Sequence, residues 1–236
     1  MRYSSPSTSG GSIVKDNLYA IAYSAVLGLV CALALTAVGE LTAERIAANK
    51  KAEEMRNILG VLGISFEAKA PFEDLEAVFD KNVRLDKVGE VKMYRYLAAD
   101  GETVQATAVP FAGPGLWGPI RGFLSLEADM VTIRGVTFHE QEETPGLGGE
   151  IAAICPGNHD EAMALDCPAW FRHQFKGKRI VDADNKPAIW IVRGGASGPN
   201  EVDAMTGATM TGDKVQAMLK EIIVKIVAAT GASDGR

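Results

Sequence analysis

A long uncharged stretch near the start of the chain predicts a membrane-spanning helix. From Leu18 to Val38 no residue carries a charge. At about 1.5 Å of rise per residue, a helix of this length covers roughly 30 Å, the thickness of a bilayer's hydrocarbon core. We therefore predict a transmembrane helix over residues 18–39. A cleaved signal peptide is the alternative, but its apolar region is shorter, at about 7 to 15 residues.

The residues on either side of this stretch are more polar. Residues 1–17 begin with a Ser-, Gly- and Pro-rich run that has little to bury, and we expect a disordered tail there. After the span, charged residues mix with apolar ones up to Gly60, which is typical of a helix leaving the membrane. We predict a helical stalk over residues 40–60 and one domain over residues 61–236.

Shorter periodicities predict the elements of that domain. Between Val91 and Gln141, four runs rich in β-branched and aromatic residues are separated by Gly, Asp and Pro, as in an antiparallel sheet: VKMYRYLA, TVQATAVPF, IRGFLSLEA and VTIRGVTF. PAIWIVRGG predicts one more strand, and the segment from Gly148 to Gln174 is typical of short helices. The C-terminal TGDKVQAMLKEIIVKIVAAT has helical periodicity. The fold class is therefore α+β, an antiparallel-sheet domain with flanking helices.

Charge excludes one class of partner and leaves the membrane orientation open. The chain has 24 Lys and Arg against 30 Asp and Glu, a net charge of −6. Nucleic-acid binding needs basic residues clustered on one face, so we expect no nucleic-acid partner. Basic residues lie on both sides of the apolar span, so charge does not decide which end faces the cytoplasm.

A threonine-rich segment precedes the C-terminal helix. It reads Asp203-Ala-Met-Thr-Gly-Ala-Thr209-Met-Thr211, and Thr211 is a candidate N-cap for the helix. Thr209 would then lie just outside a helix N-terminus, where free N–H groups and the helix dipole stabilise a phosphate. Gly207 and Ala208 would allow such a group to approach closely. A simple turn and helix cap is the alternative for so short a motif.

Four segments in fixed order give the chain a family resemblance. These segments are GPGLWGPIRGFLSLE, VTFHEQEETPGLGGE, NKPAIWIVRGG and DAMTGATMTGDKV, which follow a single N-terminal span. The chain resembles the FMN-binding domain family formed by the C subunits of Na+-translocating NADH:quinone reductases. It is less similar to a related family, the G subunits of Rnf electron-transport complexes.

The resemblance implies a covalent flavin and assigns residues to it. Thr209 would carry FMN through a phosphoester bond made from FAD by a separate Mg2+-dependent flavin transferase. Asp203 and Thr206 match the positions that this enzyme recognises. The candidates for holding the isoalloxazine ring are Trp117, Thr144, Leu147 and Gly148. Core packing is the alternative for Trp117, and a plain hairpin connection is the alternative for the ETPGLG turn.

One segment departs from the family pattern. CPGNHDEAMALDCPAWFRH holds Cys155, His159, Cys167 and His173. A Cys155–Cys167 disulfide suits a domain outside the cytoplasm. Free thiols and a zinc site are alternatives, although the spacing is unlike a zinc finger. His139, beside the ETPGLG turn, would donate to the ring or lie at a strand end. We assign neither a catalytic residue nor a metal site.

By resemblance, the chain is a membrane-anchored electron carrier with FMN as cofactor. It would belong to a reductase that couples NADH oxidation and quinone reduction to Na+ export, with the other membrane subunits as partners. We expect a single pass through the inner membrane, with the C-terminal domain in the periplasm. The alternatives are the G subunit of an Rnf-type complex and, in a different class, an anchored interaction module without a cofactor.

Overall fold

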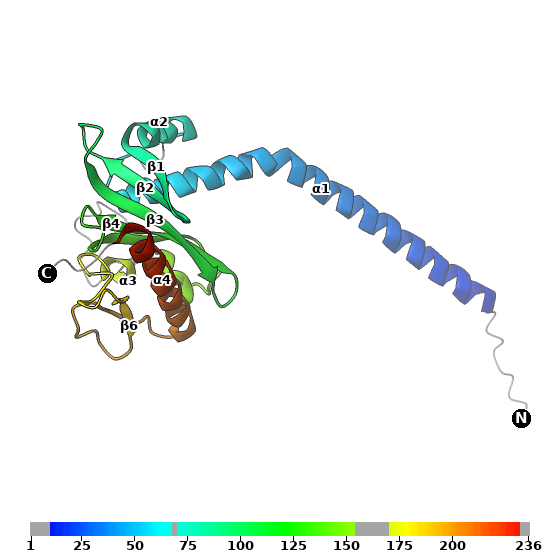
Figure 1. Ribbon diagram of the computed structural model, residues 1–236. Coiled ribbons are helices and arrows are strands. Elements are labelled where there is room, and N and C mark those ends of the chain that lie inside the picture. Colours follow the sequence, from blue (N-terminus) through cyan, green and yellow to red (C-terminus); the bar gives the residue numbers. More distant parts are fainter. Residues whose placement is uncertain (1–9, 68–69, 154–169, 232–236) are drawn as a thin grey trace, which may run out of the picture. The chain divides into compact units, whose positions relative to one another are not determined.

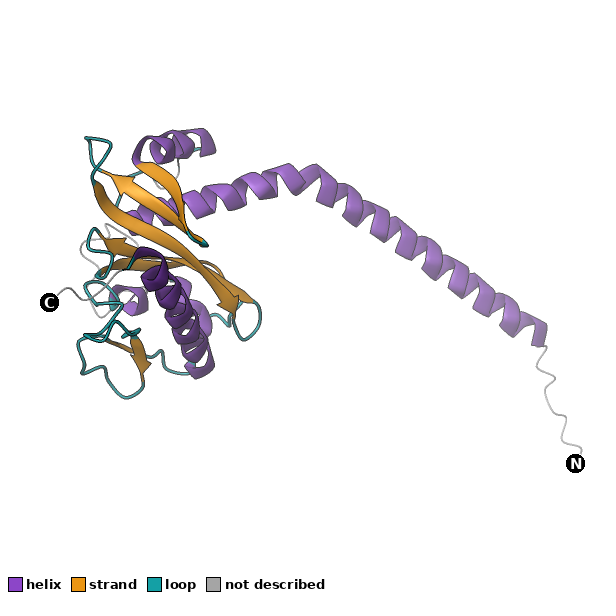
Figure 2. Cartoon of the chain, in the orientation of Figure 1, coloured by secondary structure: helices purple, strands orange, loops and turns teal. Residues whose placement is uncertain are grey.

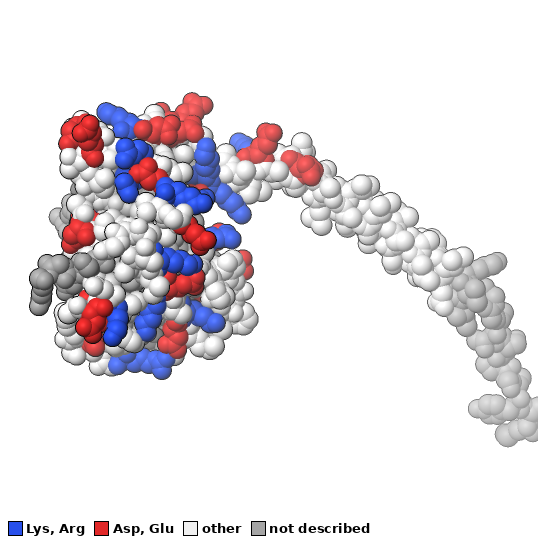
Figure 3. Space-filling model, viewed as in Figure 1, with Lys and Arg blue, Asp and Glu red and all other residues white. Residues whose placement is uncertain are grey.

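Among the residues that the structure describes, one helix is long and apolar enough to cross a membrane, and it is the first helix of the chain. The structure is a computed structural model that describes residues 10–67, 70–153 and 170–231. It divides into two units, residues 1–50 and 51–236. Helix α1 (Gly10–Leu62) runs through both, and its part from Asn17 onward is long and apolar enough to cross a membrane. Figure 3 shows the helix surface of the apolar stretch free of red and blue side chains.

The limits of α1 differ from the predicted tail and stalk. The helix begins at Gly10, inside the predicted tail, and ends at Leu62 rather than at Gly60. Gly63 has φ 72°, and the amides of Gly63 and Ile64 donate to the carbonyls of Gly60 and Leu59. This is a Schellman C-cap, which requires a left-handed residue after the last turn. The glycine that ends the helix is therefore Gly63.

The last turns of α1 are part of the domain and not of a separate stalk. Ile58, Leu59 and Leu62 are fully buried in the unit that starts at residue 51. They form a core cluster with Leu75 of α2 (Phe72–Asn82) and with Phe123 of the sheet. Burial of several large aliphatic side chains contributes about 1.5–3 kcal/mol each. The predicted boundary at residue 60 therefore lies about ten residues too late.

The domain is built on one antiparallel sheet with the strand order of the sequence. Its strands are β1 (Val83–Val88), β2 (Val91–Leu97), β3 (Val104–Pro114), β4 (Pro119–Glu127) and β5 (Ile133–Glu140). The four predicted strands are confirmed, whereas β1 and α2 were not predicted. The sequence VRLDKV does not show the alternation of apolar and polar residues that predicts a strand. The reason is that β1 lies at the edge of the sheet, where only Val83 is buried.

Each face of the sheet covers a separate core, and Figure 2 shows helices on both sides of the sheet. One face carries Phe123, Ala106 and Ala108 toward α2 and the end of α1. The other carries Val109 and Leu124 toward α4 (Thr209–Thr230) and α3 (Trp170–His173). Alternate residues of a strand point to opposite faces, so β3 and β4 serve both cores. Figure 1 shows α4 in red against the sheet. The predicted α+β fold class is confirmed.

The region between β5 and α4 contains short elements. It holds the 3₁₀ helix η1 (Gly148–Ala152) and α3, so the prediction of short helices is confirmed at both ends of that segment. The predicted strand over PAIWIVRGG shrinks to β6 (Trp190–Val192). It pairs in parallel with β7 (Glu201–Asp203) in a separate two-stranded sheet. A short connection joins the end of β7 to the start of α4.

Candidate functional site

The β3–β4 connection presents two apolar side chains to solvent. Pro114 pairs with Pro119 across the end of the hairpin, and the amide of Gly115 donates to the carbonyl of Gly118 at 2.8 Å. This tight turn leaves Leu116 and Trp117 at the tip, 44% and 69% exposed. Trp117 is therefore not a core residue, and the core-packing alternative for it is wrong.

The ETPGLGG segment forms a second turn, directly after β5. The carbonyl of Thr144 accepts from the amides of Leu147 and Gly149, at 3.1 and 3.0 Å. Gly146 has φ 75°, a conformation that costs a residue with a Cβ about 1–2 kcal/mol. The turn leaves the side chain of Leu147 exposed, while Gly148 is buried.

The third segment runs from Asp203, the last residue of β7, to the start of α4, and it contains Thr206. Gln174 holds the backbone of Asp203, since its side-chain oxygen accepts from the Asp203 amide at 2.8 Å. The Asp203 carboxylate accepts from the amide of Ala196 at 2.5 Å, so it fixes a loop at the edge of the site. Thr206 and Gly207 are exposed. Gly207 has φ 77°, which turns the chain into α4.

Helix α4 begins earlier than predicted. Thr209 is its first residue, and Ala208 is the N-cap, which makes no side-chain cap hydrogen bond. Thr211 is therefore not the cap; it lies within the first turn and is buried. An uncapped helix N-terminus has free N–H groups and a partial positive charge. Thr209 is exposed at this terminus, in the environment predicted for an attached phosphate.

Two of the three segments touch through glycines. A Cβ added to Gly207 would lie 2.7 Å from Cδ2 of Leu147, and one added to Gly148 would lie 2.4 Å from Oγ1 of Thr211. Both distances are shorter than real Cβ contacts, so a side chain at either position would push the segments apart. The ETPGLGG turn and the start of α4 thus lie side by side, and their glycines make this possible.

Glu143 joins all three segments, and it was not among the residues predicted for the site. Its Oε1 accepts from the amides of Leu116 and Trp117 at 2.7 and 3.3 Å. Its Oε2 accepts from the Thr211 hydroxyl at 2.5 Å. Only 4% of Glu143 is exposed. In the sequence, only its place as the first residue of ETPGLGG marks Glu143. A second glutamate, Glu142, directly precedes it, and the sequence does not say which of the two is buried.

An ion pair joins the start of α4 to the loop after β6. Arg193 Nη2 lies 3.2 and 3.1 Å from the two carboxylate oxygens of Asp213. Thr209 and Asp213 are four residues apart on α4 and therefore lie on one face of the helix. The Arg193–Asp213 ion pair thus lies on the face of α4 that carries Thr209.

The apolar side chains around these segments fit a flat aromatic ligand. Leu116, Trp117, Leu147 and Met210 are large hydrophobic residues that are exposed on the three segments. Scattered exposed hydrophobic residues are normal, but a group on adjoining loops marks a binding surface. The uncapped start of α4 lies beside this group and supplies N–H donors for a phosphate. The described residues therefore fit both ends of FMN.

His139 does not belong to this site. Its ring stacks on Phe123, with centroids 5.0 Å apart, and Phe123 belongs to the core cluster shared with α1 and α2. Burial lowers the pKa of the His139 imidazole below its ordinary value. Cys155, His159 and Cys167 lie outside the described residues, so the disulfide stays a prediction. His173 ends α3, and the described residues contain no cluster of metal-binding side chains.

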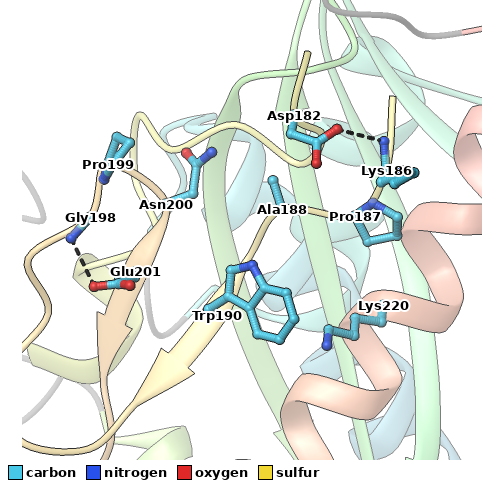
Figure 4. A pocket seen from close by; sticks show the side chains of 10 residues that line it. All are labelled: Asp182, Lys186, Pro187, Ala188, Trp190, Gly198, Pro199, Asn200, Glu201 and Lys220. Atoms are coloured by element: carbon cyan, nitrogen blue, oxygen red, sulfur yellow. Dashed lines mark hydrogen bonds between the residues drawn. The ribbon is translucent and has the colours of Figure 1, made fainter. Parts of the chain in front are cut away.

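A hollow of about 490 Å³ lies apart from the three segments and shares no lining residue with them (Figure 4). Trp190 of β6 lies at its centre, and Lys220 Nζ of α4 is 3.6 Å from the centroid of the indole ring. This cation–π contact pairs both side chains with each other.

One family model matches part of the chain. Residues 115–224 match the family model named FMN-binding domain. This range contains all three segments, including Trp117, Glu143 and Thr209.

Two similar relatives carry the same name. The C subunit of the Na+-translocating NADH-quinone reductase from Vibrio campbellii is 38% identical over 155 residues, which cover 63% of this chain and 52% of the relative. The protein of the same name from Vibrio parahaemolyticus is 41% identical over 123 residues, 51% of this chain and 41% of the relative. The chain therefore spans about half the length of the curated relatives it matches.

Two solved structures have the same fold. Shewanella oneidensis NqrC aligns with a TM-score of 0.59 and 23% identity, over 77% of this chain and 99% of that structure. The C subunit of the reductase from Parabacteroides distasonis aligns with a TM-score of 0.58 and 22% identity, over 78% and 93%. At this level of identity the likeness concerns the fold alone.

Proposed function

We propose that this chain is a membrane-anchored electron-transfer subunit with FMN bound covalently to Thr209. The match of residues 115–224 to the FMN-binding domain model and the similarity to the C subunits of Na+-translocating NADH-quinone reductases support this proposal. The observation that carries this proposal is the environment of Thr209. Its hydroxyl is exposed at an uncapped helix N-terminus, beside a group of exposed apolar side chains.

The three threonines of the segment differ in their suitability for attachment. The Thr211 hydroxyl is buried and donates to Glu143, so a transferase cannot reach it. Thr206 is exposed but precedes the helix. Thr209 is exposed and lies in the first turn, where the N–H groups and Arg193 stabilise a phosphate. Thr209 is therefore the attachment site of this proposal.

The attachment is a phosphoryl transfer. A bond forms between Oγ1 of Thr209 and the phosphorus of the FMN half of FAD, and the pyrophosphate bond of FAD breaks. AMP leaves, and the proton of the Thr209 hydroxyl passes to a base of the transferase or to solvent. The attachment leaves the flavin ring unmodified, so the ring's environment is set by the residues packed against it.

The apolar group supplies that environment. We propose that Trp117 and Leu147 cover the ring and that Thr144 and the backbone near Gly148 lie at its polar edge. When bound, FMN supplies the redox chemistry that amino-acid side chains lack. The chain's own residues orient the ring and exclude water from part of it. The exposure of Leu116 and Trp117 leaves room for an electron-transfer partner to approach.

The remaining roles belong to partners. Other membrane subunits of the reductase oxidise NADH, reduce quinone and transport Na+. For Na+ transport the reason is that an apolar span without charged residues provides no ion path. Helix α1 anchors the chain in the inner membrane, and the domain from residue 51 onward faces the periplasm. There it meets the electron donor and acceptor of the complex.

Mass analysis of single variants tests the attachment. The full chain is co-expressed with a flavin transferase, denatured, and examined for in-gel flavin fluorescence and peptide mass. Wild type, Thr206→Ala and Thr209→Ser should carry FMN on the segment, whereas Thr209→Ala should carry none. Thr209→Ser controls for the loss of the methyl group. A fluorescent Thr209→Ala band, or flavin mapped to another residue, overturns the attachment; a wild type that never takes up flavin supports the cofactor-free alternative.

A further inference from the structure

Glu143 is a buried carboxylate without a cationic partner. It is 4% exposed, and among the residues that the structure describes no Lys, Arg or His forms an ion pair with it. Burial of a carboxylate in such surroundings is costly unless hydrogen-bond donors surround it. Its presence at this position therefore calls for a reason beyond stability.

The donors around Glu143 come from segments that are far apart in the sequence. Oε1 takes the consecutive amides of Leu116 and Trp117 from the β3–β4 turn, and Oε2 takes the Thr211 hydroxyl from α4. The amide of Glu143 itself donates to the Gln141 side chain at 2.6 Å. One carboxylate thus fixes the turn that carries Trp117 to the first turn of the helix that carries Thr209.

Two glycines lie next to this carboxylate. A Cβ added to Gly115 would lie 2.5 Å from Oε1 of Glu143, and one added to Gly148 would lie 2.9 Å from Oε2. A side chain at either position would collide with the carboxylate. The two glycines are therefore what allow Glu143 to approach its donors closely.

The indole of Trp117 needs support from its backbone. Its side chain is 69% exposed, so few neighbouring atoms restrict it, and its placement depends on the backbone that carries it. That backbone is held by the Glu143 carboxylate through hydrogen bonds to an ionised group, which are the stronger kind. The same carboxylate holds Thr211, two residues after Thr209.

We propose that Glu143 is a positioning residue that sets the placement of the flavin ring relative to the flavin phosphate, by holding the Trp117 turn and the start of α4 on one carboxylate. The inference rests on the proposed function. It predicts that loss of the carboxylate releases the ring-holding turn while Thr209 remains available for attachment.

The test compares variants of the full chain in detergent, with and without the transferase. Amide hydrogen exchange at Leu116 and Trp117 should accelerate about tenfold or more in Glu143→Ala, since two backbone donors lose a charged acceptor. In loaded protein, flavin fluorescence anisotropy should fall toward that of a freely rotating ring. Glu102→Ala, which removes an exposed carboxylate from the β2–β3 connection, is the control and should match wild type in both measurements.

The conservative variant separates positioning from charge. In Glu143→Gln, the amide oxygen can accept from Leu116 and Trp117 while the amide nitrogen donates to Thr211, so exchange and anisotropy should recover. If Glu143→Ala does not fold, Thr211→Val serves instead. It removes one bond only, and it should speed exchange in the first turn of α4 and lower the anisotropy while Leu116 stays protected.

The outcomes distinguish this inference from the proposed function. Wild-type exchange in Glu143→Ala, or unchanged anisotropy despite faster exchange, overturns the positioning role. Failure of wild type to take up flavin at Thr209 contradicts the proposed function and removes the ligand from the inference. The exchange data would then show the Glu143 contacts to be structural only.

Discussion

Thr211 Oγ1 donates a hydrogen bond to Glu143 Oε2 at 2.5 Å, across 68 residues of sequence. This bond withdraws the Thr211 hydroxyl from the surface, which leaves Thr209 as the exposed hydroxyl of the first turn of α4. The helix has no side-chain cap, because Ala208 occupies the N-cap position. Thr209 is therefore an exposed hydroxyl at an uncapped helix N-terminus.

We expect Gly207→Ala to be more damaging than its size suggests. Gly207 has φ 77°, and its added Cβ would lie 2.7 Å from Leu147. The strain and the clash together should lower the free energy of unfolding by about 1–3 kcal/mol. Urea denaturation measures this loss. Gly101→Ala is the control, because Gly101 has φ 72° and no atoms within 4 Å of its added Cβ. An equal loss in both variants would show that Leu147 does not press on Gly207.

Arg193→Gln should slow the loading of flavin onto Thr209. The guanidinium lies on the face of α4 that holds Thr209, and it offsets negative charge that arrives with the phosphate. Because the Arg193 and Asp213 side chains are 63% and 66% exposed, the effect should be small, about two- to fivefold at low salt. It should diminish at high ionic strength.

Loading rates measured at two salt concentrations check this prediction. Lys220→Gln is the control, since Lys220 is also on α4 but lies over Trp190. Equal rates in wild type and Arg193→Gln at low salt would contradict the assignment of Arg193 to the phosphate.

Removal of residues 1–40 should give a soluble and folded protein. The apolar stretch that could span a membrane is lost, while the buried residues of α1 from Ala52 onward remain. Fractionation without detergent, followed by circular dichroism, measures the result. A matched deletion of residues 1–62 should fail to fold, because it also removes Ile58, Leu59 and Leu62 from the core. Dependence of the shorter deletion on detergent would count against the anchor.

Acid should destabilise the domain through His139. Burial lowers the pKa of His139 in the folded state, although Glu54, Glu140 and Glu53 act in the opposite direction and Arg121 adds to the lowering. The unfolded state then binds a proton at higher pH than the folded state. The contribution of neutral His139 to the free energy of unfolding is fully present above the ordinary pKa of histidine, near 6.5. This contribution is lost as the pH falls from there through the lower pKa of the folded state.

Urea unfolding of wild type and His139→Phe between pH 7.5 and pH 5 tests the sign. Phenylalanine can keep the stacking on Phe123 and has no proton to bind, so the variant should show a shallower loss of stability. Identical slopes in the two proteins would exclude His139 as the cause.

The sequence by itself determined the local elements and the order of the motifs. The uncharged stretch from Leu18 to Val38, the four strands from Val91 onward and the C-terminal helix depend on periodicity, which is a property of neighbouring residues. The segments around Trp117, Leu147 and Thr209 were also found in the sequence, through the family resemblance.

Only the tertiary structure decided how these segments are joined. Glu143 and Thr211 are ordinary polar residues in the sequence, and nothing near either one predicts that they share a hydrogen bond. Likewise, the last turns of α1 look like a charged stalk until the sheet buries one side of them. Contacts between distant residues depend on how the chain folds back on itself, and no local periodicity contains that information.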